Sequence, residues 1–169
     1  MSSPVKLGML AWNQYTTWPA MREAAVRADQ LGYDDLWTWD HLYPIVGSDQ
    51  GPILEGWTVL AGWAGATELA RIGLMVGANP FRNPALVAKM ATTLDHVSGG
   101  RAILGIGGAW FETEHTAYGI RFGASPGERL RWLDEAARID GQVVYWFQAS
   151  IPSLTGELTG GGSPARRGP

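Results

Sequence analysis

The sequence predicts an α/β fold in which parallel strands alternate with helices. Short apolar runs alternate four times with amphipathic helical patterns, and a polar or glycine-rich segment follows each run. Strands that alternate with helices pair in parallel through right-handed crossovers, so their carboxyl ends should share one edge. A doubly wound sheet and a β/α barrel both fit this alternation.

The first two strand–helix units lie between residues 5 and 64. An apolar run at residues 5–10 predicts the first strand, and a helix follows from the starter Pro19 to the stop at Gly32. Residues 35–39 predict the second strand, and after a polar loop residues 57–64 predict the second helix. The apolar positions of the first helix recur at helical spacing: Met21, Ala24, Ala25, Ala28 and Leu31.

The third and fourth units follow the same pattern. Residues 72–76 predict a strand, Pro84 opens a helix, and Gly99 and Gly100 end that helix. Residues 102–106 predict the fourth strand, and after an irregular loop Pro126 begins the last helix. The apolar faces of these two helices carry Val87, Met90, Ala91, Leu94 and Val97, and Leu130, Leu133 and Ala137.

The composition indicates a globular protein without a nucleic-acid partner. Of the 169 residues, 46% are hydrophobic and 17% are charged, and the formal net charge is −3. The absence of cysteine excludes disulfides, thiolate zinc sites and cysteine nucleophiles. Because the N-terminus lacks a signal-peptide pattern and the longest apolar stretch is too short to span a bilayer, we expect a cytoplasmic protein without a membrane partner.

The composition changes after residue 140, where the strand–helix pattern ends. From Ser150 onward, 13 of 20 residues are Gly, Pro, Ser or Thr, a composition typical of flexible tails. We therefore assign residues 1–140 to the strand–helix domain and expect residues 141–169 to form an irregular tail, disordered or of non-native sequence.

The segment after the first strand favours the barrel. A doubly wound sheet normally places its phosphate-binding glycine loop there, but this chain has Ala11-Trp12-Asn13-Gln14. A barrel instead presents chemical groups at the carboxyl end of every strand. The groups at these four ends are Trp12 and Asn13, Asp40 and His41, residues 77–79, and residues 107–110.

A long motif spans residues 83–110. It begins Asn83-Pro84, passes through Ser98-Gly99-Gly100-Arg101 and ends Gly105-Ile106-Gly107-Gly108-Ala109-Trp110. This stretch resembles the bacterial-luciferase-like flavin and deazaflavin oxidoreductases. Trp37-Thr38-Trp39-Asp40-His41 resembles the second-strand signature of the branch that uses the deazaflavin coenzyme F-420, and residues 125–135 resemble the helix after the fourth strand.

The resemblance implies an oxidoreductase or monooxygenase that moves hydride between coenzyme F-420 or FMN and a small organic substrate. Family members are complete eight-stranded barrels, which need about 250 residues or more. The fold that we expect is therefore a TIM-type (β/α) barrel of which about the first four units are present, a half-barrel. A truncated or frame-shifted product would explain the pattern.

Asp40 and His41 form the sharpest polar pair. The resemblance implies that Asp40 contacts the deazaflavin and that His41 faces the substrate as a proton donor or acceptor. Histidine as a residue type exchanges protons near neutral pH, which suits this role. A helix-capping aspartate beside a structural histidine is the alternative.

Three tryptophans stand beside this pair at strand ends. Trp12, Trp39 and Trp110 are positioned to line a substrate pocket with flat indole rings. The alternative is that they close the end of the barrel core.

Two glycine-containing segments are candidates for the cofactor site. The family often has unusual backbone geometry at the end of the third strand, sometimes a cis non-proline peptide, which implies that Val76 and Gly77 contact the cofactor. An ordinary Asn-Pro turn at residues 79–80 is the alternative. Gly107 and Gly108 would let the fourth strand pass close to the cofactor, although tight strand–helix packing explains them equally well.

Glu112 is the candidate catalytic carboxylate. One deazaflavin branch has a glutamate directly after the glycine run, where this chain has Trp110, with Glu112 and Glu114 just beyond. Acidic residues at a helix start also complement the helix dipole, so a structural role stays open. Three histidines at no recognised ligand spacing predict no metal site.

Two functions therefore remain open. The first is a redox enzyme with His41 and Glu112 as catalytic residues. The second is a catalytically inactive half-barrel that self-associates, as a homodimer, through the unpaired edges of its first and fourth strands. A nucleotide-binding Rossmann module ranks last, because no phosphate-binding glycines follow the first strand.

Overall fold

The computed structural model describes residues 5–150, with side chains described for residues 5–139. The elements, in chain order, are β1 (Gly8–Leu10), α1 (Trp18–Gln30), β2 (Asp35–Thr38), α2 (Gly56–Ala64), β3 (Arg71–Leu74), β4 (Gly77–Ala78), η1 (Asn79–Phe81), α3 (Pro84–Ser98), β5 (Ala102–Ile103), β6 (Ile106–Gly107), α4 (Glu112–Tyr118) and α5 (Pro126–Ser150). The alternation predicted from the sequence is present.

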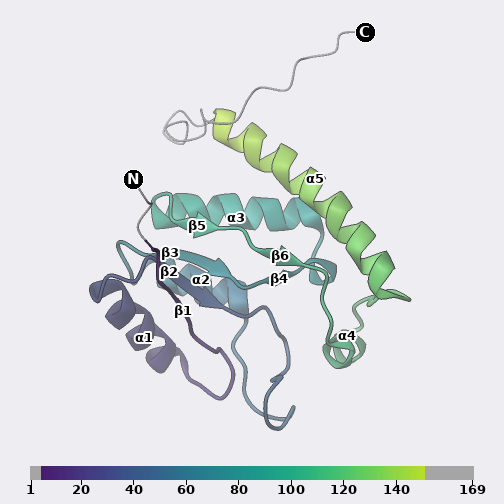
Figure 1. Cartoon of the computed structure of the whole chain (residues 1–169), viewed down its shortest axis with the longest axis horizontal. Helices are drawn as coiled ribbons and strands as arrows, with labels where there is room; N and C mark the ends of the chain where they lie inside the picture. The colour runs from purple at the N-terminus through teal and green to yellow at the C-terminus, as the bar shows by residue number, and fades with distance from the viewer. Residues whose placement is uncertain (1–4, 151–169) are drawn as a thin grey trace.

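The strands form a parallel sheet in the order β1-β2-β3-β5, and β4 and β6 form a short second parallel pair. Figure 1 shows α1, α2 and α3 arranged around this sheet, with α5 lying across α3. The prediction of an α/β class with parallel strands is confirmed.

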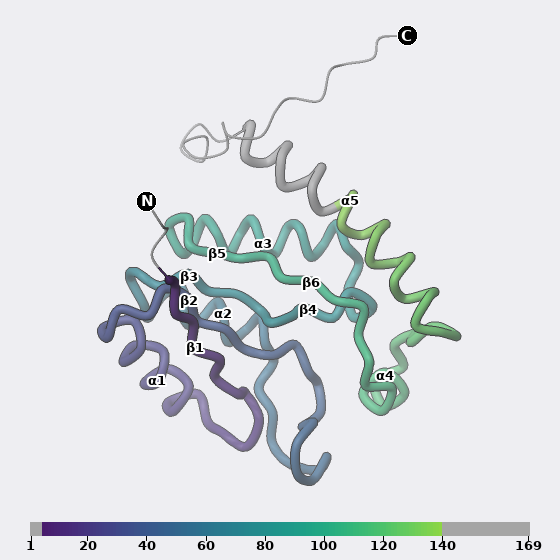
Figure 2. Tube along the Cα trace, in the orientation of Figure 1, coloured from purple at the N-terminus to yellow at the C-terminus, as the bar shows by residue number. Residues whose placement is uncertain are grey.

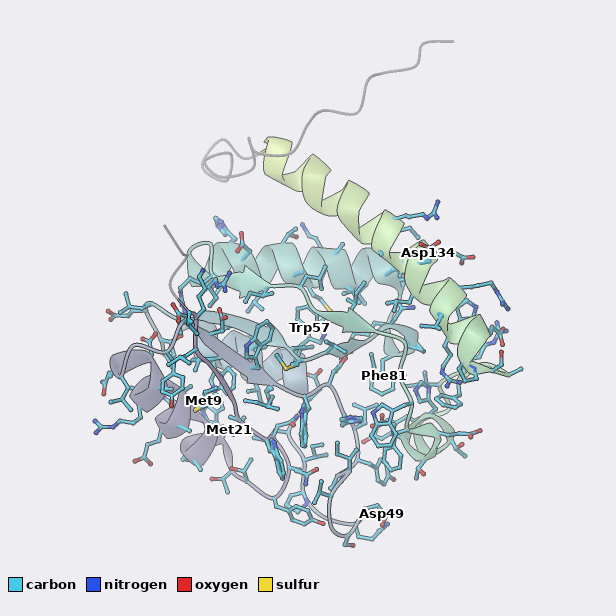
Figure 3. All side chains as sticks on the ribbon, viewed as in Figure 1. Met9, Met21, Asp49, Trp57, Phe81 and Asp134 are labelled. Carbon is cyan, nitrogen blue, oxygen red and sulfur yellow. The ribbon has the colours of Figure 1, made fainter. Side chains whose placement is uncertain are left out.

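The hydrophobic core lies between the sheet and helices α1, α2 and α3. Alternate strand residues such as Leu36 and Ile72 are fully buried against these helices, and Trp63 of α2 is the largest fully buried side chain. Figure 3 shows Met9 of β1 and Met21 of α1 near each other at one end of this core. Burying each large side chain contributes roughly 1.5–3 kcal/mol, so the core fixes the strands relative to one another.

The opposite face of the sheet lies outside this core. It carries Trp37 of β2, whose indole lies against Gly8 of β1 and Gly73 of β3, and an ion pair of 2.7 Å between Arg71 and Asp35. Leu10, at the edge strand, is exposed. Within the described part of the chain, no helix covers this face in Figure 1.

Side-chain caps stabilise the starts of α2 and α3. The Asn83 side chain accepts a hydrogen bond from the Ala85 N–H at the start of α3, with Pro84 in the first turn. Glu55 caps α2 in the same way through the N–H groups of Trp57 and Thr58. Gly99 ends α3 with φ of 70°, a left-handed conformation that favours glycine.

The third and fourth strands differ from the prediction, because each is interrupted. Residues 72–76 and 102–106 are not two continuous strands: β3 ends at Leu74, β5 ends at Ile103, and pairing resumes between β4 and β6. Between the paired parts, one chain segment contains three residues, Leu74, Met75 and Val76, whereas the opposite segment contains two, Leu104 and Gly105. This mismatch is a bulge, a device that re-aims a strand end next to a site.

The region after β6 also differs from the prediction. The loop before Pro126 contains a helix, α4, which ends at Gly119 in the left-handed conformation. Helix α5 continues to Ser150, so the predicted boundary at residue 140 falls inside a helix rather than at its end. Residues 151–169, the remainder of the predicted irregular tail, lie outside the described residues.

In the described part of the chain, none of the helices combines the length and apolar character needed to cross a lipid bilayer.

Candidate active site

A cavity of about 370 Å³ opens where the carboxyl ends of the strands meet. Figure 2 shows the chain leaving β1, β2, β4 and β6 on the same side of the sheet, towards α4 and the loop before α2. Its lining includes these residues predicted from the sequence: Trp39, Asp40, His41, Val76, Gly77, Gly107, Gly108 and Trp110. These residues come from the ends of β2 and β6 and from the segment around β4, whereas Trp12 and Asn13, which follow β1, are not among the residues that line the pocket.

The bulged strand ends form the floor of this pocket. There the segments around Val76 and Gly107 lie very close to each other. The Met75–Val76 peptide is cis, and both side chains are about half exposed. A Cβ on Gly107 would lie 2.5 Å from Cγ2 of Val76, and a Cβ on Gly77 would lie 3.0 Å from the Gly105 carbonyl oxygen. Larger residues at positions 77 and 107 would therefore displace this floor.

One wall of the pocket is aromatic. Trp12 stacks on Trp39 with ring centroids 4.8 Å apart, and the rings of Trp39 and Trp110 lie nearly perpendicular to the His41 ring, with centroid distances of 6.2 and 5.7 Å. Trp12 and Trp110 are 50% and 62% exposed, far more than core tryptophans such as Trp63. Trp39 and Trp110 line the pocket, whereas Trp12 contacts the lining residue Trp39 without lining the pocket itself.

Asp40 lies buried at the back of the pocket and binds an arginine that the sequence analysis did not identify. The Arg82 guanidinium donates to both carboxylate oxygens of Asp40, at 2.7 and 3.0 Å, and the Ala78 N–H donates to the same carboxylate at 2.9 Å. Burial raises the pKa of Asp40, and the hydrogen bonds and positive charge of Arg82 oppose that rise.

Arg82 also binds Glu55, at 2.7 Å. Burial acts to raise the pKa of Glu55, but the hydrogen bonds from Thr58 and Trp57 and the charge of Arg82 outweigh it, so that the pKa is lowered. Arg82 thus connects the end of β2 with the start of α2, and Asp40, which Arg82 holds, also binds the Ala78 N–H of β4.

His41 is held by a glutamate from α4. Its Nδ1 lies 2.9 Å from Oε1 of Glu114, and the Leu42 N–H donates to Oε2 of the same carboxylate at 2.8 Å. Glu114 is 1% exposed and lines the pocket. Among the described residues, Nε2 of His41 makes no hydrogen bond and is not enclosed.

Glu112, the predicted catalytic carboxylate, is exposed on the first turn of α4 and does not line the pocket. Glu114, two residues later on the same helix, occupies the buried position instead. Acidic residues followed by the Tyr118-Gly119 stop signal could have indicated this helix from the sequence, and its helical spacing would have placed residues 112 and 114 on different faces.

A second missed residue positions the glycine turn. Arg129 of α5 is buried and its Nε donates to the Ala109 carbonyl oxygen at 3.3 Å. Ala109 has φ of 60°, an unusual conformation for a residue with a side chain. No local signal near residue 109 points to an arginine twenty residues later.

The pocket has the shape and chemistry to bind a flat, largely apolar ring. Its floor combines close backbone approach with exposed apolar side chains, its wall carries the indoles of Trp39 and Trp110, and its polar groups are His41, Asp40 and Glu114. Such a site can hold a ring system against a second small molecule and exchange a proton beside it.

Comparison with known proteins assigns this fold and site to a family. A profile of the family described as luciferase-like monooxygenase matches residues 5–150. The chain belongs to the luciferase-like monooxygenase family, as its motifs indicated.

Individual relatives include oxidoreductases and monooxygenases. An F-420-dependent glucose-6-phosphate dehydrogenase of Kineococcus radiotolerans is 34% identical over 150 residues, 88% of this chain and 43% of its own length. The 4-hydroxyprotoasukamycin monooxygenase of Streptomyces nodosus subsp. asukaensis is 35% identical over 98 residues, 58% of this chain and 25% of its own length. The chain spans less than half the length of these relatives.

Solved structures show the same architecture. An F-420-dependent secondary alcohol dehydrogenase in complex with an F-420–acetone adduct matches with a TM-score of 0.72 and 25% identity, over 81% of this chain and 41% of that one. The oxygenating constituent of 3,6-diketocamphane monooxygenase from Pseudomonas putida, in complex with FMN, shares the fold with a TM-score of 0.63 and 22% identity, over 80% of this chain and 38% of that one.

Proposed function

We propose that the described residues form the cofactor- and substrate-facing half of an oxidoreductase that transfers hydride between coenzyme F-420 or FMN and a small organic substrate. The observation that carries this proposal is the convergence of the aromatic wall, the glycine floor and the His41–Glu114 pair on one pocket. Relatives named for F-420 dependence and a structural neighbour in complex with FMN support both cofactors.

The residues have distinct parts in this proposal. Val76, Gly77, Gly107 and Gly108 hold the ring of the cofactor, which when bound supplies the hydride acceptor or donor. Asp40 acts through its contacts to Arg82 and Ala78, which keep β4 in place. Trp12, Trp39 and Trp110 line the substrate side and exclude water, and His41 exchanges the substrate's proton.

We also propose that this chain is half of a TIM-type barrel. Four parallel strands with helices around one face match the first half of an eight-stranded (β/α) barrel. The open face with Trp37 then corresponds to the barrel interior, and the strand ends to the rim that carries active sites in this fold.

The floor of the pocket offers a direct test. Gly107→Ala would push Val76 towards the cavity, because the new Cβ would lie 2.5 Å from Cγ2 of Val76. The wild-type 169-residue chain should quench the fluorescence of F-420 or FMN saturably when it is titrated in. Gly107→Ala should weaken the cofactor affinity about tenfold or more, which corresponds to a loss of about 1.4 kcal/mol of binding free energy.

Gly127→Ala is the matched control, because a Cβ there meets nothing closer than 3.8 Å. It should bind like the wild type. If neither fluorophore is quenched at micromolar wild-type protein, or if both variants bind equally, the proposed site is wrong.

A second candidate function is self-association without catalysis, which the open sheet face supports. Parallel sheets are normally covered on both faces, yet Leu10 and Trp37 lie outside the core and β1 and β5 are edge strands in the described sheet. Two copies related by a twofold axis could pair β1 of each with β5 of the other and close an eight-stranded barrel. That arrangement would be a homodimer.

Light scattering coupled to size-exclusion chromatography separates these states. The second candidate predicts a dimer that Leu10→Glu on the open face converts to monomer, while Leu31→Glu, exposed after α1, leaves the dimer intact. A well-folded wild-type monomer would exclude self-association.

A further inference from the structure

The pairing of His41 with Glu114 determines which ring nitrogen faces the pocket. Glu114 comes from α4 and His41 from the end of β2, so the fold brings together two groups that lie 73 residues apart. The carboxylate is 1% exposed, and both of its oxygens are used. Such a contact has little freedom to rearrange.

Hydrogen-bonding capacity assigns the proton. The Leu42 N–H donates to Oε2, and when Glu114 is ionised its carboxylate can only accept, so that Oε1 accepts from Nδ1 of His41. Nδ1 therefore carries a hydrogen whether the ring is neutral or charged. The nitrogen that gains or loses a proton is Nε2.

The aromatic neighbours fix the plane of the ring. Trp39, Trp110 and Phe111 meet His41 nearly perpendicularly, with interplanar angles of 87°, 75° and 71°. The ring is thus held at Nδ1 by Glu114 and around its edges by three rings. Nε2 is left without a hydrogen-bond partner among the described residues.

We infer that Glu114 is a positioning residue that keeps neutral His41 in its Nδ1–H tautomer, so that Nε2 is the atom that takes the proton from a substrate hydroxyl. This inference rests on the proposed hydride transfer for its chemical purpose. In that reaction a substrate C–H bond breaks, its electron pair leaves with the hydride to the oxidised flavin or deazaflavin, the O–H proton passes to Nε2, and a carbonyl remains.

Replacing the carboxylate by an amide should reverse the tautomer. In Glu114→Gln the Leu42 N–H can still only donate, so the amide oxygen turns to Leu42 and the amide NH₂ faces Nδ1 of His41. Nδ1 must then accept, and the ring proton moves to Nε2. Glu112→Gln makes the same chemical change on the exposed turn of α4 and is the matched control.

The experiment is a long-range ¹H–¹⁵N correlation of the histidine rings in the ¹⁵N-labelled 169-residue chain. The sequence has three histidines, which keeps assignment simple. We expect Nδ1–H for neutral His41 in the wild type and in Glu112→Gln, and Nε2–H in Glu114→Gln.

Two results would overturn the inference: an Nε2–H tautomer in the wild type, or an unchanged tautomer in Glu114→Gln. If the glutamine variant does not fold, the wild-type spectrum still decides. The measurement needs no cofactor, so failure of F-420 or FMN to bind the same samples counts against the proposed function and leaves the tautomer assignment standing. Where turnover is measurable, Glu114→Gln should lower it by about 100-fold or more with unchanged cofactor affinity.

Discussion

At the scale of single residues, the pocket depends on the buried ion pair between Arg82 and Asp40. Arg82 is shared between Asp40 and Glu55, and the three side chains come from different segments of the chain. Removing one partner of a buried pair leaves the other charge uncompensated, which costs more than the pair itself contributes.

Arg82→Leu should therefore lower the free energy of unfolding by about 3 kcal/mol, because Asp40 loses its cation while it stays buried. Urea denaturation at neutral pH measures this change. Arg138→Leu, which breaks an exposed pair with Asp134, should cost less than about 0.5 kcal/mol. Similar small effects in both variants would show that Arg82 does not stabilise the pocket.

His115 should make the stability depend on pH. Its ring lies between Phe81 and Phe122, at centroid distances of 4.9 and 4.8 Å, and neither nitrogen has a hydrogen-bond partner among the described residues. Burial lowers the pKa of His115 from its ordinary value of 6.5, with the charge of Arg129 acting in the same direction and Glu114 opposing it. Figure 3 shows Phe81 on the side of the molecule that faces α4.

The sign follows from proton uptake. As the pH falls below 6.5, the unfolded chain takes up a proton at His115 before the folded chain does. The free energy of unfolding is therefore highest above that pH and decreases as the pH falls. Between pH 7 and pH 5, His115→Phe should flatten the decline of the unfolding free energy by up to about 1.4 kcal/mol per pH unit. His96→Asn, at an exposed position, should leave the slope as in the wild type. Parallel curves for His115→Phe and the wild type would contradict this account.

Residue types at strand ends could be predicted, but long-range contacts could not. Asp40, His41 and the tryptophans at positions 12, 39 and 110 were identifiable because each lies at or just beyond the end of a predicted strand. Arg82, Glu114 and Arg129 act on partners 42, 73 and 20 residues away, and no local pattern encodes such distances. The sequence does not show which face of α4 is buried, so it does not distinguish the buried Glu114 from the exposed Glu112.

At the scale of elements, α2 shows how backbone contact positions the pocket. A Cβ on Gly56, at its first turn, would lie 2.5 Å from the Trp39 carbonyl oxygen and 2.8 Å from Cδ2 of Leu74. The helix start therefore packs directly on the strand end that carries Asp40. Gly65, at the other end, has φ of −87° and no heavy atom closer than 4.0 Å to such a Cβ.

The same substitution at these two glycines should have opposite effects. Gly56→Ala forces the helix away from β2 and should destabilise the protein by about 2 kcal/mol. Gly65→Ala reduces the freedom of the unfolded chain without strain and should stabilise it by about 0.5 kcal/mol. Thermal unfolding gives both values, and changes of the same sign would rule out the proposed packing.

Element starts were more predictable than element interruptions. Pro19, Pro84 and Pro126 marked helix starts correctly, because each precedes an amphipathic pattern and proline is favoured in the first helical turn. The bulge between β3 and β4 was not predictable, because it arises from the mutual approach of two strands. A Cβ on Gly105 would lie 2.4 Å from the Leu74 carbonyl oxygen, a contact that neither sequence segment shows alone.

At the scale of the whole molecule, the parallel arrangement follows from the regular alternation of strands and helices, which was predictable. The surface that covers the open face of the sheet could not be predicted, because the sequence places Trp37 in a strand without showing what packs against its indole. The cytoplasmic location expected from the sequence stays a prediction.

The central claim is that the strand ends form one cofactor-binding mouth, and the tryptophan side chains in and around that mouth can report on it. We would record indole ¹H–¹⁵N spectra of the chain while adding F-420 or FMN. The account predicts that the indole signals of Trp12, Trp39 and Trp110 shift, while that of Trp63, fully buried in the core, does not. Unchanged signals for Trp12, Trp39 and Trp110 at saturating cofactor would contradict the account. Shifts confined to Trp18 of α1 would contradict it as well.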